Sequence, residues 1–525
     1  MYAMLNYYSD TQDKINIDLN SKSESLYNKT MSMISFVDPE ILAMGEEKVN
    51  SFISSTKGLE VYKHDLSNLF RKAKHTLSEK EEKSLAEVKA IYNLPVNLYN
   101  LLNNNEIKFE NAVDKVGNKI EITPGKFKNL MSSPDRVIRE STYNSVFGAY
   151  TDMREIFAGV YAGNIKNEAY FAKARGYNSS LEASLFENNI PVEVYQNLIT
   201  TVGNGLEAFR KYFGLVKNVL GLEILKPYDL NAPIFAESKK IIKYEEGKNL
   251  TLESIAVLGD EYVDIAKNIF DSKIIDVYEN KGKIGGAFSF GAYGMDPYII
   301  MSYNDDLKSL FTLTHELGHS MHTQYRNTNQ PFVYADCTLL TAETAATTHE
   351  AILADYLIKT TEDKNLKAVL LNNQIQNFLV TFFRQSMFAE FEMKAHGLGA
   401  DALRMDADFF SSIWKEGLQK FFGEHLEIDD KIINEWARIP HLHNSPFYVY
   451  QYPTGFAAAS AIAKGIIENG KESADKFINM LKSGSSEYSL PLLKKAGVDM
   501  STPKPIKDAL AVFASLVYEL ERLII

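Results

Sequence analysis

The stretch His315-Glu316-Leu-Gly-His319 constrains this chain more than any other part of its sequence. If the stretch is helical, His315 and His319 share one face and lie about 6 Å apart along the axis. Two imidazoles at that spacing can hold one zinc ion, whose bonds to nitrogen are about 2.0–2.1 Å long. Glu316 is rotated away from both, so we expect it to miss the ion and reach a water beside it. The pattern predicts a zinc site with an adjacent general base, as in zinc hydrolases. The alternative is a helix with two buried, hydrogen-bonded histidines.

A later helix is expected to supply the third zinc ligand. A catalytic zinc takes three protein ligands and keeps a fourth position open. The segment that follows Thr341 is rich in small residues and offers two carboxylates, Glu343 and Glu350. On a helix they lie about 10 Å apart along the axis, so both cannot bind one ion. We predict Glu343 as the ligand and expect Glu350 to accept the other N–H of a ligating histidine. The alternative for Glu350 is a surface charge.

Three neighbours of the motif have simpler interpretations. His322 lies about 10 Å from His315 along a helix, too far to share the ion, and is expected in the core or the site wall. Gly318 costs about 1 kcal/mol inside a helix, so we predict that another backbone, such as that of the Glu343 helix, approaches it closely. Cys337 is predicted to be a small packed residue rather than a nucleophile.

Glycines and aromatic residues are concentrated just before the motif. The run Ile284-Gly-Gly-Ala-Phe-Ser-Phe is followed by the β-type run Pro297–Tyr303, which together predict a small strand pair. Glycines allow close approach of another backbone, and an open strand edge can bind an extended peptide. Gly286, Ala287 and Phe288 are therefore candidates for substrate binding. The alternative is a glycine-rich structural turn.

The rest of the chain indicates a mainly α fold. Apolar residues recur at helical spacing almost throughout, with long helices predicted from Ser133 to about Ala174 and over Lys367–His396. A β-hairpin is expected near residues 106–122, where Gly117-Asn118 is a turn signal. No repeat or Pro/Ser-rich linker is evident. We predict one continuous body with an N-terminal helical region, 1–270, and a catalytic region, 271–525.

Composition excludes several classes of protein. The 525 residues carry a formal charge of −12 and no basic run, which does not favour nucleic acid. One cysteine allows no intramolecular disulfide and fits a reducing compartment. The N-terminus has no basic stretch before an apolar core, so no signal peptide is expected. No run of about 18 apolar residues occurs, so no membrane span is expected. We expect a cytoplasmic protein.

The motif and its surroundings resemble a known family. The segments that carry the resemblance are His315–His322, Gln330–Asp336, Thr341–Glu343, Ala172–Pro191, Arg438–His441 and Phe447–Tyr452. Together they resemble the oligoendopeptidase F branch of the thimet-oligopeptidase-like zinc peptidases, and the likeness covers most of the chain. The resemblance implies a helical body around a deep channel, with one Zn²⁺ at its floor, that cleaves short peptides and excludes folded proteins.

The family's functional residues can be matched individually. Its zinc ligands fall on His315, His319 and Glu343, and its general base falls on Glu316. It also has a late histidine and tyrosines that contact the oxyanion. The nearest matches are His441, Tyr450 and Tyr452, and the alternatives His443 and Tyr448 stay open.

Two departures from the family pattern are evident. Members of this branch usually carry an extra helical segment before the point where this chain starts, so a lobe is expected to be missing or truncated. His349 stands where an uncharged polar residue is more usual, and we expect it to add a pH-sensitive contact near Glu350.

Three functions remain open on the sequence. The first is a zinc endopeptidase for oligopeptides. The second is a zinc exopeptidase such as a dipeptidyl carboxypeptidase, which needs a cationic group for the substrate C-terminus that the sequence does not place. The third is an inactive, zinc-stabilised peptide-binding protein, against which the intact Glu316 argues. The sequence does not determine the oligomeric state.

Overall fold

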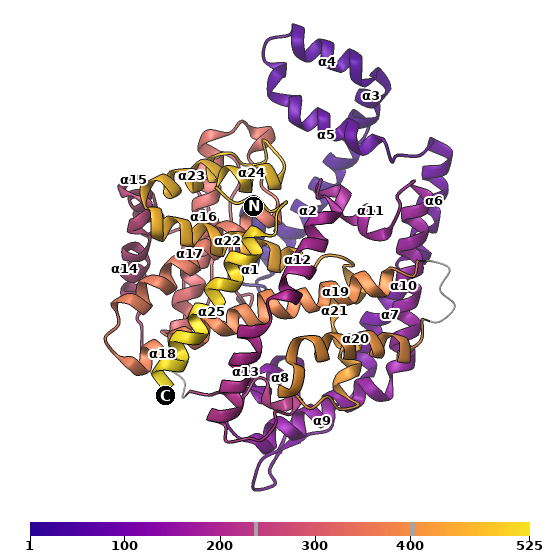
Figure 1. The fold of residues 1–525 in the computed structure, drawn as a ribbon. Helices are drawn as coiled ribbons and strands as arrows, with labels where there is room; N and C mark the ends of the chain where they lie inside the picture. Colours follow the sequence, from indigo (N-terminus) through magenta and orange to yellow (C-terminus); the bar gives the residue numbers. More distant parts are fainter. Residues whose placement is uncertain (236–239, 400–404, 525) are drawn as a thin grey trace. The chain divides into compact units, whose positions relative to one another are not determined.

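The fold of the chain is mainly α, as the sequence predicts (Figure 1). The computed structural model describes residues 1–235, 240–399 and 405–524. Strands in this described part are two or three residues long. None of its helices combines the length and the apolar composition that a membrane crossing requires.

The chain divides into two compact units, each assembled from three separate segments. Unit 1 comprises Met1–Lys74, Ser238–Leu370 and Gly455–Met500. Unit 2 comprises His75–Glu237, Leu371–Thr454 and Ser501–Ile525. The boundary predicted between residues 270 and 271 lies inside unit 1. Each unit therefore depends on contacts between residues that are far apart in the chain.

Unit 1 holds both helices of the zinc-site prediction and a small sheet. Its helices are α1 (Tyr2–Ser9), α2 (Lys14–Ile34), α3 (Val37–Met44), α4 (Glu46–Ser55), α5 (Lys63–Ala73), α14 (Tyr244–Ser254), α15 (Asp260–Asp271), α16 (Leu307–Asn329), α17 (Leu339–Thr360), α23 (Lys471–Lys482) and α24 (Ser489–Lys495). A unit boundary falls within each of two further helices, α18 (Lys364–Asn377) and α22 (Gln451–Asn469).

Unit 2 contains the remaining helices. These are α6 (Glu79–Tyr92), α7 (Leu94–Leu101), α8 (Pro124–Met131), α9 (Arg136–Asp152), α10 (Arg154–Ala174), α11 (Ser180–Glu187), α12 (Val192–Asn204), α13 (Glu207–Val219), α19 (Arg384–His396), α20 (Ala407–Phe422), α21 (Pro440–Asn444) and α25 (Lys504–Ile524). Shorter turns include the 3₁₀ segments η3 (Pro227–Asp229) and η8 (Ile432–Arg438) and the π-helical η6 (Phe378–Phe383).

Helices α16 and α17 lie side by side in unit 1 (Figure 1). Each begins at a side-chain cap: Asp306 accepts the Ser309 N–H at the start of α16, and Thr338 accepts the Thr341 N–H at the start of α17. Such caps satisfy N–H groups that have no partner within the helix. The apolar residues of α16 that are fully buried include Leu313, Leu317 and Met321. Capping and burial together fix the helix that carries the motif.

Both predicted β elements are present. Strands β1 (Ala112–Val113) and β2 (Lys119–Ile120) pair antiparallel and form the hairpin expected near 106–122. Strands β4 (Phe288–Phe290) and β5 (Tyr298–Ile300) pair antiparallel just before α16. A third strand, β3 (Ile275–Asp276), adds to β5 in parallel, so the sheet order is β3-β5-β4. The sequence analysis missed β3, which is two residues long.

Two long helices differ from their predicted forms. The helix predicted from Ser133 to Ala174 is two helices, α9 and α10, which meet at Met153 (φ −103°, ψ 7°). The helix predicted over Lys367–His396 contains the π-helical η6 between α18 and α19. Neither point has a glycine or proline, which are the usual sequence signals of a break.

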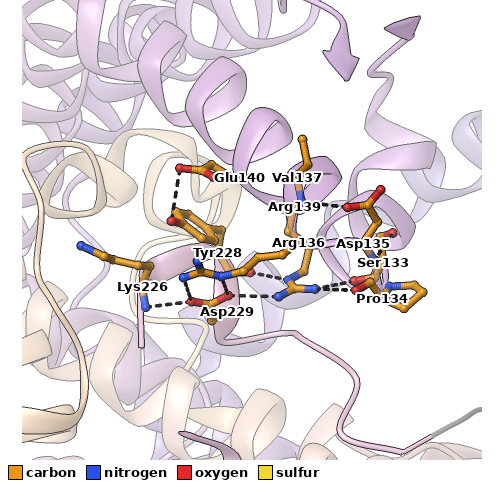
Figure 2. A network of polar contacts seen from close by, with 10 residues as sticks. All are labelled: Ser133, Pro134, Asp135, Arg136, Val137, Arg139, Glu140, Lys226, Tyr228 and Asp229. Carbon is orange, nitrogen blue, oxygen red and sulfur yellow. Dashed lines mark hydrogen bonds and ion pairs between the residues drawn. The ribbon is translucent and has the colours of Figure 1, made fainter. Parts of the chain in front are cut away.

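A buried carboxylate in unit 2 ties η3 to α9 (Figure 2). Asp229 is fully buried and accepts hydrogen bonds from Arg136 at 2.9 and 2.8 Å and from Arg139 at 3.0 Å. Arg139 also donates to the Tyr228 carbonyl, and the Lys226 N–H donates to Asp229. Burial alone would raise the pKa of Asp229, but the bonds from Arg136, Lys226 and Arg139 outweigh it and lower the pKa.

Candidate metal centre

Three side chains from α16 and α17 converge on one point in unit 1. His315 Nε2 lies 3.1 Å from His319 Nε2, and the two nitrogens lie 3.8 Å from Glu343 Oε2 and Oε1 respectively. Ligand atoms at tetrahedral angles around zinc, with bonds of about 2.0–2.1 Å, are about 3.4 Å apart. The observed spacings lie on either side of that value, so the donor set fits zinc. Elsewhere in the described ranges, no comparable group of His, Cys, Asp or Glu is found.

Glu350 fixes the orientation of one of these rings. Its Oε1 lies 2.5 Å from His315 Nδ1, on the far side of the ring from Glu343. When Nδ1 donates its proton to this carboxylate, Nε2 presents a lone pair towards His319 and Glu343. A carboxylate behind a ligating histidine is the usual way in which proteins set the tautomer and orientation of the ring.

The charges around the rings favour a cation between them. Burial lowers the pKa of His315, but Glu350, Glu316 and Glu343 outweigh it and raise that pKa to about 9. Burial, together with His315, lowers the pKa of His319 to about 3, so its ring is neutral and can donate a lone pair. The carboxylates therefore create a negative potential at the point where the nitrogens converge.

Glu316 lies beside this cluster in a buried position. It is 5% exposed, and burial raises its pKa to about 7. His315 opposes this rise, Glu343 adds to it, and the Ser289 N–H lowers the pKa. A carboxyl group whose pKa is near neutral can take up and release a proton at neutral pH, as a general base must.

The edge strand β4 is attached to the metal helix. Ser289 Oγ and Ser320 Oγ are 2.8 Å apart, and β4 is at one edge of the sheet. Gly286 is exposed, with φ +93°, whereas Ala287 and Phe288 are partly buried. The candidate substrate-binding residues therefore lie at or just before an edge strand that packs on α16.

The backbones of α16 and α17 approach each other closely at Gly318. A Cβ at Gly318 would lie 2.7 Å from the Cα of Ala346, which confirms the prediction that another backbone approaches this glycine.

The expectation that His349 makes a pH-sensitive contact near Glu350 is wrong. His349 is fully buried, with Nε2 2.8 Å from Tyr262 Oη and Nδ1 2.9 Å from the Ala345 carbonyl. Burial lowers its pKa to about 4, so it stays neutral and acts in packing.

The two remaining neighbours of the motif are packed. His322 is 2% exposed, and burial lowers its pKa to about 3. Cys337 Sγ accepts from the Arg326 guanidinium at 2.6 Å, while burial raises the pKa of the thiol to about 11. A protonated thiol is a poor nucleophile, which agrees with the predicted packing role.

The oxyanion candidates lie in unit 2. His441, Tyr448 and Tyr452 form an aromatic group: ring centroids of His441 are 6.2 Å from Tyr448 and 5.8 Å from Tyr452. Tyr452 Oη lies 3.4 Å from His441 Nε2, and all three residues are partly exposed. These three side chains are thus less enclosed than the other candidates.

Two other members of the predicted set are buried in unit 2. Tyr450 is 3% exposed and packs on Tyr195, with ring centroids 5.2 Å apart. His443 is 1% exposed and stacks on Tyr99 at 4.1 Å. Both ring nitrogens of His443 are buried without a hydrogen-bond partner among the described residues.

Sequence analysis missed two residues near Glu316. Ser320 is four residues after Glu316 on α16, so it shares a helix face with the base, and that spacing was a usable signal. Its partner Ser289 lies in a run of small and aromatic residues. Nothing in that run distinguishes Ser289 from its neighbours.

Comparison with known proteins identifies the family. Residues 129–512 match peptidase family M3, and residues 40–109 match the family described as oligopeptidase F. The oligopeptidase PepF of Bacillus subtilis (strain 168) is 38% identical over all of this chain and 78% of its own length. An oligoendopeptidase F homolog of Lactococcus lactis subsp. lactis (strain IL1403) is 35% identical, over all of this chain and 87% of its own length.

Solved structures agree with this assignment. The crystal structure of oligoendopeptidase-F from Enterococcus faecium has a TM-score of 0.78 and 32% identity, covering all of this chain and 89% of that one. A crystal structure from Chlamydophila abortus has a TM-score of 0.95 and 33% identity, covering 99% of this chain and 87% of that one. Because the family matches, the relatives and the solved structures agree, this protein belongs to peptidase family M3, in its oligoendopeptidase F branch, and is a metallopeptidase.

Proposed function

We propose that the chain is a zinc-dependent endopeptidase that hydrolyses short oligopeptides. The observation that carries this proposal is the convergence of His315, His319 and Glu343 at spacings that fit zinc, with Glu316 beside them. When bound, zinc supplies Lewis-acid chemistry, since it polarises a carbonyl and makes water more acidic. A purely structural zinc has no use for an adjacent base, which disfavours an inactive binding protein.

Glu316 is the proposed general base. It takes a proton from the attacking water as the water oxygen bonds to the scissile carbonyl carbon. It then delivers this proton to the nitrogen of the departing amine as the C–N bond breaks. The raised pKa of Glu316, caused mainly by burial, suits both steps, because the carboxyl must be deprotonated first and protonated afterwards.

Two further groups are proposed to hold the substrate. An extended peptide adds to the edge of β4 beside Gly286, Ala287 and Phe288, where backbone hydrogen bonds do not depend on substrate side chains. His441 and Tyr452 donate to the developing oxyanion, because they are partly exposed whereas His443 and Tyr450 are buried. A site that recognises the substrate backbone and the charge of the oxyanion fits a broad range of short peptides.

Hydrolysis of an internally quenched peptide by Glu316→Gln tests the base. The variant should keep its zinc, because Glu316 is not a ligand, and kcat should fall by about 10²- to 10⁴-fold. Glu253→Gln is the matched control, since it removes an exposed carboxylate of α14 that bonds to Tyr356. A zinc-loaded Glu316→Gln with the wild-type rate would overturn the assignment.

Peptides with blocked ends separate endopeptidase from exopeptidase. A peptide that is acetylated at its N-terminus and amidated at its C-terminus offers no terminal charge. An endopeptidase cleaves it internally at a rate close to that of the free peptide, and mass spectrometry identifies the products. Cleavage that requires a free C-terminal carboxylate would identify a carboxypeptidase instead.

A further inference from the structure

The segment before α22 contains a phenylalanine in a strained backbone conformation. Phe447 has φ +57°, in the left-handed region, and its side chain is 2% exposed. This conformation is unfavourable for a residue other than glycine, because its Cβ comes too close to the following carbonyl oxygen. Such a conformation persists when surrounding contacts over-determine it, and it is concentrated at functional sites.

A buried glutamate on α19 holds this backbone. Glu392 is fully buried, and its Oε1 accepts the Phe447 N–H at 2.8 Å. The Phe447 ring packs against His396, one turn further along α19, with ring centroids 4.6 Å apart, and against Tyr195 at 6.1 Å. Backbone and ring are thus both fixed by side chains of unit 2.

Glu392 is held in its neutral form. Burial raises its pKa to about 8, and the Phe447 N–H opposes this rise only in part. The titratable side chains that influence or pack around this pair are Tyr161, Tyr195 and His396, and burial lowers the pKa of His396 to about 3. A protonated carboxyl accepts a hydrogen bond through its carbonyl oxygen, so glutamine, which is close to it in shape, can accept the same bond.

Tyr452, one of the two residues proposed to contact the oxyanion, lies in the segment that follows Phe447. Tyr448 follows it directly, and Tyr452 is five residues further along. The two rings are 5.5 Å apart, and both pack near His441. The backbone at Phe447 therefore sets the direction in which the Tyr448–Tyr452 segment leaves α21.

We propose that Glu392 is a positioning residue, which holds the Tyr448–Tyr452 segment in its catalytic conformation by accepting the Phe447 N–H. This proposal rests on the proposed function, because it assumes that the segment acts on the oxyanion. Glu392 itself has no contact with the reacting atoms. It acts through one backbone hydrogen bond.

Glu392→Gln and Glu392→Leu separate the hydrogen bond from the filling of space. Glutamine should keep kcat within about twofold of wild type, because its carbonyl still accepts the Phe447 N–H. Leucine fills the site without an acceptor, and kcat should fall by about 10- to 100-fold, as for catalytic groups displaced by about 1 Å. KM and zinc content should stay close to wild type, because β4 and the proposed ligands belong to unit 1 and Glu392 to unit 2. If Glu392→Leu does not fold, Glu392→Asp replaces it, since a shorter side chain cannot reach the N–H.

Hydrogen exchange measures how firmly the Phe447 amide and the residues after it are held, and it does not depend on catalytic activity. The Phe447 amide and its neighbours up to Tyr452 should exchange faster in Glu392→Leu than in wild type, and at the wild-type rate in Glu392→Gln. Ser386→Ala is the matched control: Ser386 is a buried polar residue of α19 whose hydroxyl donates to the Phe382 carbonyl in the adjoining η6. It should change neither exchange in the segment nor kcat.

The outcomes distinguish this proposal from the function on which it rests. Unchanged exchange in Glu392→Leu, or equal damage by Gln and Leu, overturns the positioning role. Faster exchange with wild-type kcat also overturns it, because the segment is then not held for catalysis. If His441 and Tyr452 variants retain full activity while Glu392→Leu loses kcat, the oxyanion assignment fails and Glu392 positions some other group of the segment.

Discussion

Glu350 is expected to act through its contact with His315. Its carboxylate lies 2.5 Å from His315 Nδ1, and it is one of three carboxylates that raise the pKa of that ring. The other two, Glu316 and Glu343, are the proposed base and ligand. Removing Glu350 should therefore weaken the site without removing either a ligand or the base.

Glu350→Gln should lower zinc affinity by about 10- to 100-fold, because such outer partners orient the ligating ring. Competition with a chromogenic chelator measures the change. Asp355→Asn is the matched control, since Asp355 lies on the same helix and pairs with Lys359. An affinity that Glu350→Gln leaves unchanged would mean that His315 is oriented by its own packing.

Substitutions of two tyrosines in the Tyr448–Tyr452 segment are expected to lower kcat by very different factors. Tyr452→Phe should lower kcat by about 10²- to 10³-fold, the effect of losing one oxyanion donor. Tyr450→Phe should leave kcat within about twofold of wild type, because Tyr450 is buried against Tyr195. Steady-state hydrolysis of the quenched peptide gives both values. The reverse order would show that Tyr450 is the donor.

The sequence left fewer alternatives for the proposed metal-centre residues than for the proposed oxyanion residues, for a physical reason. His315, Glu316, His319 and Glu343 lie on regular helices, where residue spacing determines direction. His441 to Tyr452 lie in an irregular segment, where no period relates position to direction. Side-chain burial, which the sequence alone does not give, is the basis on which we propose His441 rather than His443 and Tyr452 rather than Tyr450.

At the level of elements, the metal centre depends on how closely α16 and α17 pack. Gly318 lies where the two backbones meet, and Ala345 and Ala346 on α17 are fully buried. A Cβ at position 318 would force the helices apart. His319 and Glu343 would then separate, although neither side chain had been changed.

Gly318→Ala should lower the free energy of unfolding by about 1–3 kcal/mol, as overpacking does, and should weaken zinc binding as well. Gly159→Ala is the matched control, because Gly159 is an exposed residue of α10 with open space around it. It should raise the free energy of unfolding by about 0.5–1 kcal/mol. Urea denaturation measures both, and equal effects of the two substitutions would contradict the close approach.

The contact between η3 and α9 predicts a dependence on pH (Figure 2). The folded pKa of Asp229 is lowered, so its stabilising effect is complete above the ordinary carboxyl pKa of about 3.9 and is lost as pH falls through the folded value. Asp229→Asn should lower the free energy of unfolding at neutral pH by about 3–5 kcal/mol, since Arg139 stays buried without its partner.

Urea denaturation at several pH values tests whether the stabilising effect of Asp229 is lost in acid. The difference between wild type and Asp229→Asn should shrink as pH falls below about 3.9. Asp135→Asn is the control, because Asp135 caps α9 and asparagine caps equally well. A difference that grows in acid would contradict the lowered pKa.

Regular elements were predictable from sequence, and their interruptions were not. The periodicity of apolar residues predicted α16 and α17 and the hairpin near 106–122. The division between α9 and α10, the π-helical η6 and the strand β3 depend on tertiary contacts, since no glycine or proline marks the first two. Such features arise where packing between distant segments overrides local preference.

At the scale of the whole molecule, the chain crosses between its two units several times. Unit 1 contains the proposed zinc ligands and the proposed base, and unit 2 contains the proposed oxyanion residues and Glu392. No continuous piece of sequence corresponds to either unit. Long-range contacts decide such a division, and a single sequence does not reveal them. The sequence therefore predicted one body with a boundary at residue 270.

The central claim is that His315, His319 and Glu343 hold one zinc ion on which all hydrolysis depends. Returning zinc stepwise to the chelated protein, while following hydrolysis of the quenched peptide, tests it most directly. We expect no hydrolysis without metal, a rate that rises in proportion to added zinc, and a plateau at one zinc per chain. Glu343→Ala should stay inactive at the same zinc concentrations. Full hydrolysis by the zinc-free protein, or by zinc-loaded Glu343→Ala, would contradict this claim.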